Sequence, residues 1–227
     1  MSVQLSVSPD ADATAQAAVA RLEAWAQECI RTQNRFLMAL AGGSTPRRVY
    51  DLWASTSRLN WPQVDLVFGD ERCVPPDHPA SNYGMVKQAL IANLPRPPRV
   101  HRMPGEDADP DHAALQYERT LNKLMEPEEG VDLALLGIGA DGHTASLFPE
   151  SPALDEMKRR CVATTAPDGK SRRLTLTFAE LRRAQRIMFL VVGKDKAKIL
   201  REVLEGDLNP LKLPSQNLLR DYELETY

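Results

Sequence analysis

The chain has 227 residues, of which 43% are hydrophobic and 26% are charged, an ordinary composition for a globular protein. Its net charge of −3 provides no basic field, which disfavours a nucleic-acid partner but leaves a small anionic substrate compatible. Three cysteines, odd in number and far apart, argue against a disulfide framework and a Cys-rich zinc site. Since neither a secretory signal nor an apolar run of the roughly 20 residues that span a bilayer is present, we expect a cytoplasmic protein with no membrane partner.

The first elements expected along the chain are a short edge strand at 3–7 and a long helix ending near Thr32. Apolar residues of that helix recur every three or four positions, and either Asp10 or Asp12 can act as its N-cap. The apolar run FLMALA at 36–41 predicts a buried strand, and GGSTP at 42–46 predicts a turn that opens a helix. Free N–H groups, hydroxyls and the helix dipole favour an anion there, although a plain capped turn fits the same residues.

The rest of the chain continues to alternate strands and helices. Apolar or alternating runs predict strands at 64–68, 100–103, 131–138, 161–166, 174–178 and 187–192, with a closing strand at 222–227. Helical spacing and capping residues predict helices at 81–93, 109–125, 178–184, 196–205 and 215–219. The alternation favours an α/β fold, Rossmann-like and doubly wound, with a mostly parallel sheet and helices on both faces. With no repeat and no linker-like segment, we expect residues 1–227 to form a single domain.

Four polar loops leave the carboxyl ends of these expected strands: GGSTP at 42–46, GDER at 69–72, GIGADGH at 137–143 and GKDK at 193–196. Ligands of open α/β sheets bind beyond the carboxyl ends of the strands. The sequence therefore predicts that the four loops line one ligand site at one edge of the sheet.

The GIGADGH loop contains the residues best suited to catalysis. Gly139 and Gly142 allow a sharp turn and a close approach of the backbone to a ligand. Asp141 and His143 are two residues apart, so both can face one cleft, where an imidazole with a carboxylate acts as a general base. A strand-ending turn with a solvated aspartate and a surface histidine explains the same pattern. The residues of the other loops are therefore needed to choose between a catalytic site and a plain surface turn.

The loops together resemble the 6-phosphogluconolactonase family. The matching stretches are ALAGGSTPRRVYD, VFGDERCVPPDHPASNYGM, LLGIGADGHTASLFP, RRLTLTF and LVVGKDKA, in order along essentially the whole chain. The related glucosamine-6-phosphate deaminases share the fold and the DGH core but look different after the histidine and at GDER, so Arg72 and Phe148-Pro149 favour the lactonase. The terminus RDYELETY departs from the family's Trp-containing end.

The resemblance implies hydrolysis of 6-phospho-D-glucono-1,5-lactone to 6-phospho-D-gluconate in the oxidative pentose phosphate pathway. The lactone carbonyl is already electrophilic, so this chemistry requires neither a metal, a cofactor nor a covalent nucleophile. His143 is then the base that deprotonates water, and either Asp141 or Asp70 orients it. Arg72 would hold the substrate and stabilise the oxyanion.

A second group of residues is assigned to the substrate and its phosphate. It comprises Gly42, Gly43, Ser44, Thr45, Arg47, Asn82, Arg173 and Lys194. Simpler interpretations remain open: Arg47 can face solvent, Arg173 can merely flank a strand, and Asn82 can be only a helix cap. We expect Cys73 to be a packed thiol and His101 to lie on the surface.

The expected partner is a small phosphorylated sugar lactone, bound by a monomer or weak homo-oligomer. Two alternatives are an isomerase-deaminase of glucosamine 6-phosphate that uses the same histidine, and a non-catalytic sugar-phosphate sensor. The sensor is disfavoured because regulators of that type carry a DNA-binding module, for which the expected domain leaves no room.

Overall fold

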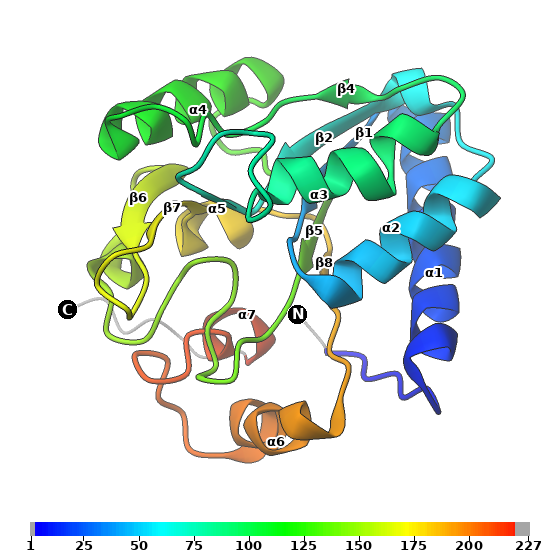
Figure 1. Cartoon of the computed structure of the whole chain (residues 1–227). Coiled ribbons are helices and arrows are strands. Elements are labelled where there is room, and N and C mark those ends of the chain that lie inside the picture. Colours follow the sequence, from blue (N-terminus) through cyan, green and yellow to red (C-terminus); the bar gives the residue numbers. More distant parts are fainter. Residues whose placement is uncertain (1–2, 221–227) are drawn as a thin grey trace.

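Five parallel strands form the central sheet of the computed structural model, which describes residues 3–220 (Figure 1). Their order is β4-β2-β1-β5-β8. The strands are β1 (Phe36–Leu40), β2 (Val64–Phe68), β4 (Arg99–Val100), β5 (Leu133–Leu136) and β8 (Ile187–Phe189). Every residue of β1, β2 and β5 is buried, because helices or a second sheet cover both faces. The predicted mostly parallel, doubly wound sheet is confirmed.

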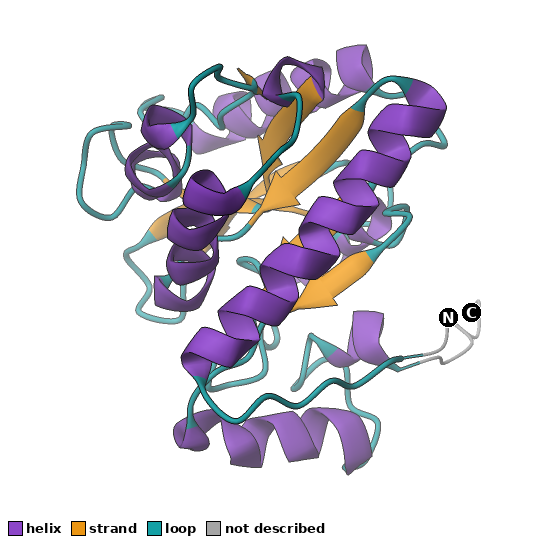
Figure 2. Ribbon diagram, turned by 90° about the vertical axis from the view of Figure 1, so that its right-hand side faces the viewer, coloured by secondary structure: helices purple, strands orange, loops and turns teal. Residues whose placement is uncertain are grey.

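The helices divide between the two faces of this sheet as right-handed crossovers require. The longer ones are α1 (Ala11–Gln33), α2 (Ser44–Thr56), α3 (Asn82–Ala89), α4 (Pro110–Leu124) and α6 (Ala197–Glu205), and the short ones are α5 (Phe178–Leu181) and α7 (Gln216–Leu219). Helices α1, α2 and α3 pack on one another over one face, whereas α4 lies on the other (Figure 1). Figure 2 shows the long α1 crossing in front of the strands.

A second, antiparallel sheet was not predicted. Its order is β3-β7-β6, formed by β3 (Asp70–Arg72), β7 (Arg172–Leu176) and β6 (Cys161–Thr165), and α4 packs against it. The prediction that GDER is a loop is therefore wrong for its last three residues. Gly69 joins the two sheets, since its N–H donates to Leu40 O (2.9 Å) and its carbonyl accepts from Leu176 N (2.8 Å).

Several predicted boundaries differ from the structure at the margins of the fold. The strand expected at 3–7 is wrong, because the segment pairs with no strand and Val3, Leu5 and Val7 are exposed. The helix expected at 81–93 is α3 followed by a separate 3-10 turn, Ile91–Asn93. The closing strand expected at 222–227 lies outside the described residues. Among residues 3–220, no helix is both long and apolar enough to cross a membrane.

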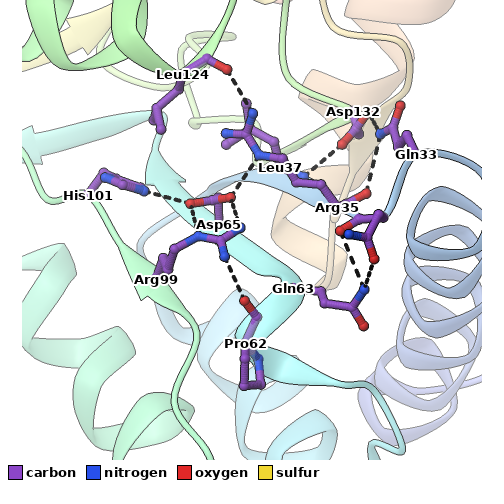
Figure 3. A network of polar contacts seen from close by, with 11 residues as sticks. Gln33, Arg35, Leu37, Pro62, Gln63, Asp65, Arg99, His101, Leu124 and Asp132 are labelled. Carbon is purple, nitrogen blue, oxygen red and sulfur yellow. Dashed lines mark hydrogen bonds and ion pairs between the residues drawn. The ribbon is translucent and has the colours of Figure 1, made fainter.

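A buried carboxylate organises the amino-terminal edge of the parallel sheet (Figure 3). Asp65, on β2, accepts hydrogen bonds from Arg99 Nη2 (2.6 Å) and Arg35 Nε (2.7 Å), and its Oδ1 lies 2.8 Å from His101 Nε2. Burial raises the pKa of Asp65, but these three partners outweigh burial and hold that pKa well below its usual range. The expectation of a surface His101 is wrong, because its ring is tied to this network. The polar cluster stabilises the edge opposite the predicted site.

Candidate active site

The carboxyl ends of β1 and β5 form the topological switch point of the parallel sheet. From β1 the chain winds outward to β2 and β4, and from β5 it winds the other way to β8. Loops that follow the two central strands therefore separate, and this is where ligands of doubly wound sheets bind. The loop after β1 is GGSTP and the loop after β5 is GIGADGH, so the fold brings the two predicted motifs to the same place.

The GGSTP loop places the amino terminus of helix α2 at the carboxyl end of β1. Helix α2 begins at Ser44, and its N-cap is Gly43, with a φ of 102° that favours glycine and with no side-chain capping bond. The N–H groups of the first turn are therefore left for an anion. Ser44 is exposed and Thr45 half-buried, so their hydroxyls lie at the same surface. Tyr50 fixes the start of the loop, because its hydroxyl bonds both the N–H (3.1 Å) and the carbonyl (3.0 Å) of Ala41.

His143 is oriented by Asp141. The imidazole Nδ1 lies 2.5 Å from Asp141 Oδ1, which also accepts the backbone N–H of His143 at 3.2 Å. Burial raises the pKa of Asp141, but the charge and hydrogen bonds of His143 outweigh burial and hold that pKa below its usual range. Within residues 3–220, Nε2 of His143 has no hydrogen-bond partner. Of the two candidate carboxylates, Asp141 is the one that contacts the imidazole, and Asp70 bonds other groups.

The turn around His143 is held on several sides. The N–H of Gly139 donates to His143 O at 2.8 Å, and a Cβ on Gly139 would overlap the imidazole. The Phe148 ring lies 4.8 Å from the imidazole, centroid to centroid, so the SLFP segment forms a wall of the site. Gly142 has a φ of 81°, and its carbonyl accepts from the N–H of Ser215 at 2.9 Å. Ser215, directly before α7, thus helps to hold the GIGADGH loop in place.

A buried polar group joins the other loops. Asn82 Nδ2, at the start of α3, donates to both Asp70 O (2.9 Å) and Asp70 Oδ1 (3.0 Å). Ser146 Oγ donates to Asp70 Oδ2 at 2.6 Å. A Cβ on Gly42 would overlap the Asn82 amide, so only glycine fits there. The α3 N-cap is Ser81, and Asn82 instead connects the GGSTP and GDER segments, to which Ser146 joins the DGHTAS segment through Asp70.

Two arginines form the basic part of the site. Arg72 on β3 lies directly opposite Arg173 on β7 in the antiparallel register. Burial, together with the neighbouring charge of Arg72, lowers the pKa of Arg173, whereas Asp70 opposes this shift. Arg72 Nη1 donates to Ala80 O at 2.6 Å, which anchors the loop that follows β3. The structure thus brings together Arg72, Arg173 and Asp70 from two of the sheet's strands.

Sequence reasoning missed the role of Glu71, which is only 2% exposed. Its carboxylate accepts hydrogen bonds from the N–H groups of Arg72, Asn82 and Tyr83 at 2.7–2.8 Å and from Ser81 Oγ at 3.0 Å. Burial raises its pKa, and the four donors oppose that rise. Glu71 therefore fixes α3 to β3. Glu71 was visible in the sequence, but the sequence did not show that the chain after β3 returns to bond its carboxylate through Ser81, Asn82 and Tyr83.

The remaining predicted cations lie toward the solvent. Arg47 is exposed and faces Asp51, with Nε 4.0 Å from the carboxylate. Lys194 is exposed in a 3-10 turn, Lys194–Lys196. Its neighbour Lys196, which was not singled out, is half-buried and donates from Nζ to Ile138 O at 3.1 Å. Lys196 thus contacts the GIGADGH loop that carries His143.

Cys73 is half-buried next to β3, and burial is the main cause that raises the pKa of its thiol. A thiol that stays protonated is a poor nucleophile, in keeping with the packed thiol expected there. Over the described span 3–220, no group of three or more His, Cys, Asp or Glu side chains is close enough to hold a metal ion.

Comparison with known proteins identifies similar sequences of one family. A family model described as glucosamine-6-phosphate isomerases/6-phosphogluconolactonase matches residues 9–225. A 6-phosphogluconolactonase of Treponema pallidum is 38% identical over 180 residues, which cover 77% of this chain and 74% of that protein. A 6-phosphogluconolactonase of Synechocystis is 37% identical over 202 residues, covering 87% of this chain and 83% of the other.

Solved structures show the same similarity. The 6-phosphogluconolactonase of Trypanosoma brucei superposes with a TM-score of 0.86 at 25% identity, covering 96% of this chain and 92% of that one. A 6-phosphogluconolactonase from Shewanella baltica gives a TM-score of 0.83 at 26% identity, covering 94% and 91% of the two chains. The likeness therefore extends over nearly the whole fold.

Proposed function

This chain belongs to the glucosamine-6-phosphate isomerase/6-phosphogluconolactonase family, and we propose from that membership and from its geometry how its site works. Its activity is the hydrolysis of 6-phospho-D-glucono-1,5-lactone to 6-phospho-D-gluconate, a step of the oxidative pentose phosphate pathway. The observation that carries the mechanism is His143, bonded through Nδ1 to Asp141 while Nε2 is left for water.

In the first step, Nε2 of His143 takes a proton from water as the water oxygen bonds to the lactone carbonyl carbon. The carbonyl π electrons move onto oxygen, and the resulting oxyanion is stabilised by the guanidinium of Arg72. Collapse of the tetrahedral intermediate restores the carbonyl and breaks the bond to the ring oxygen. That oxygen receives the proton from the imidazolium, so His143 is regenerated. Asp141 holds the ring and stabilises its transient charge.

The phosphate is assigned to the helix amino terminus and the cations near it. The uncapped N–H groups at Gly43, Ser44 and Thr45 supply neutral donors. Arg173 offers a fork of donors that matches phosphate oxygens. Lys194 and Lys196 lie on the turn after β8 and supply further positive charge. Asn82 and Gly42 shape the base of the site, and Arg47 contributes only long-range charge from its exposed position.

The test is hydrolysis of freshly made lactone, with the spontaneous rate subtracted. His143→Ala should lose most of the enzyme-dependent rate, about 10²–10⁴-fold, while 6-phosphogluconate still binds. Wild-type turnover in that variant would remove His143 as the base. Glucosamine 6-phosphate is run alongside, and substantial ammonia release without lactone hydrolysis would favour the deaminase instead.

We further propose a cytoplasmic enzyme that acts as a monomer or weak homo-oligomer and consists of one domain over residues 1–227. Free thiols at Cys29, Cys73 and Cys161 suit a reducing compartment. The groups assigned to catalysis all come from one chain, so no second subunit is needed to complete them. Size-exclusion chromatography with light scattering measures the oligomeric state, and a stable tetramer would overturn that part.

A further inference from the structure

Arg72 and Arg173 form a pair of guanidinium groups without a carboxylate partner. The two residues face each other across β3 and β7, where like charges repel. Within residues 3–220 neither makes an ion pair; Arg72 donates to the carbonyl of Ala80, and Arg173 Nη1 makes a long 3.4 Å contact with Arg172 O. Arg72 Nε is also buried without a hydrogen-bond partner. Such an arrangement costs free energy unless an anion arrives.

The charges of two carboxylates, Asp168 and Asp70, act on Arg173. Both carboxylates accept hydrogen bonds from neutral donors and form no ion pair with it. Asp168 accepts from the N–H groups of Lys170 and Ser171 at 2.8 Å and from Ser171 Oγ at 2.5 Å, which ties it to its own turn. Asp70 accepts from Asn82 Nδ2 at 3.0 Å and Ser146 Oγ at 2.6 Å. Both raise the pKa of Arg173 through their charge, yet neither touches it.

Asp70 is placed so that a direct ion pair would otherwise form. It lies two residues from Arg72 on β3, so both side chains point to the same face of the sheet. Arg173 is its diagonal neighbour across the strand pair, because Asp70 lies opposite Thr175 and Arg72 opposite Arg173. A diagonal separation of about 7–8 Å is within reach of an arginine. Arginine and carboxylate form strong, bidentate pairs, so something must hold Asp70 away.

Ser146 holds one oxygen of the Asp70 carboxylate, Oδ2, while Asn82 holds the other, Oδ1. Ser146 is 1% exposed, and its backbone N–H donates to Thr175 Oγ1 at 3.2 Å, which fixes the residue against β7. Its hydroxyl makes the shorter of the two side-chain bonds to the Asp70 carboxylate. Because Ser146 follows the His143 turn, it couples the catalytic loop to the basic strands.

We propose that Ser146 is a positioning residue whose hydrogen bond keeps the Asp70 carboxylate off Arg72 and Arg173, leaving both guanidinium groups free for the phosphorylated substrate. This deepens the proposed function and rests on its phosphate site at Arg173. Without the hydroxyl, Asp70 turns toward the arginines and acts as an internal competitor of the substrate's phosphate. Loss of the Arg173 contact to the phosphate then appears in ligand affinity and KM.

A double-mutant cycle between positions 146 and 70 tests this, with the dissociation constant of 6-phosphogluconate measured by titration calorimetry. Ser146→Ala should weaken binding about tenfold in the wild-type background, within the coupling range of contacting residues. In the Asp70→Asn background the same substitution should change affinity by less than about twofold, because no carboxylate remains to compete. An equal loss in both backgrounds, or no loss in either, overturns the proposal.

Three further variants make the result specific. Ser151→Ala is the matched control: this hydroxyl bonds Thr164 Oγ1 at 3.2 Å and the N–H of Ala153 at 3.3 Å but not Asp70, and its removal should leave affinity unchanged. Ser146→Cys keeps the size of the side chain but donates weakly, so it should follow Ser146→Ala. Arg173→Ala separates the two proposals. If it leaves affinity unchanged, the phosphate site and the role of Ser146 both fall; if it weakens affinity while the cycle shows no coupling, only the role of Ser146 falls.

Discussion

Replacing Asp141 by asparagine isolates what the carboxylate contributes to His143. Asp141 Oδ1 accepts both the Nδ1 proton and the backbone N–H of His143, and an asparagine oxygen can accept the same two bonds. The substitution therefore preserves the geometry of the turn and removes the negative charge. In the transition state that charge stabilises the imidazolium formed when His143 takes the proton from water.

The size of the effect follows from the exposure of the pair. Two unit charges about 4 Å apart interact by about 1 kcal/mol in water and about 4 kcal/mol at an effective dielectric constant of about 20. The side chains of His143 and Asp141 are 29% and 41% exposed, so solvent screens part of the attraction. A loss of about 1.4–2.7 kcal/mol corresponds to a kcat about 10- to 100-fold lower.

The assay is the enzyme-dependent rate of lactone hydrolysis for Asp141→Asn, His143→Ala and the double variant. The double variant should be no slower than His143→Ala, because the carboxylate acts only through the imidazole. Affinity for 6-phosphogluconate should stay within about twofold of wild type in Asp141→Asn. A wild-type kcat in Asp141→Asn, or a double variant much slower than His143→Ala, would refute this reasoning.

Other substitutions test the scaffold of the site. Gly42→Ala should lower stability by about 1–3 kcal/mol and weaken 6-phosphogluconate binding, since the new methyl group overlaps the Asn82 amide; an unchanged melting temperature and affinity would show that Asn82 can move at no cost. Glu71→Gln should cost about 1–3 kcal/mol in urea unfolding, because the amide offers one acceptor oxygen where the carboxylate offers two, and its NH2 group would face donors. Acidification should destabilise the fold through Asp65, because the pKa of this carboxyl is lower in the folded chain than its value of about 3.9 in the unfolded chain. The stabilisation is complete above the unfolded pKa and is lost as the pH falls through the folded pKa. In Asp65→Asn, the difference in unfolding free energy between neutral and strongly acidic pH should be smaller than in wild type, and an identical pH dependence would exclude Asp65 as a source.

Several features of this protein follow from local sequence alone. The run FLMALA predicts a buried strand, and β1 is one: a strand covered on both faces needs no polar alternation. The periodic apolar residues and the Asp10 cap account for α1, and the four polar segments all follow parallel strands, although most of GDER forms a strand itself. The residues proposed for catalysis, Asp141 and His143, were likewise visible from their spacing.

Only the tertiary structure decided how these pieces meet. Two carboxylates were equal candidates for His143 in the sequence, and the folded chain separates them: Asp141 bonds the imidazole, and Asp70 is held by Asn82 and Ser146. The antiparallel pairing that sets Arg72 opposite Arg173 joins segments about 100 residues apart, a separation over which no local periodicity carries information. Helical and strand patterns arise from interactions between near neighbours in the chain. Hydrogen-bond partners and cross-strand registers depend on which distant segments share the limited space of the core, so they emerge only when the whole chain has packed.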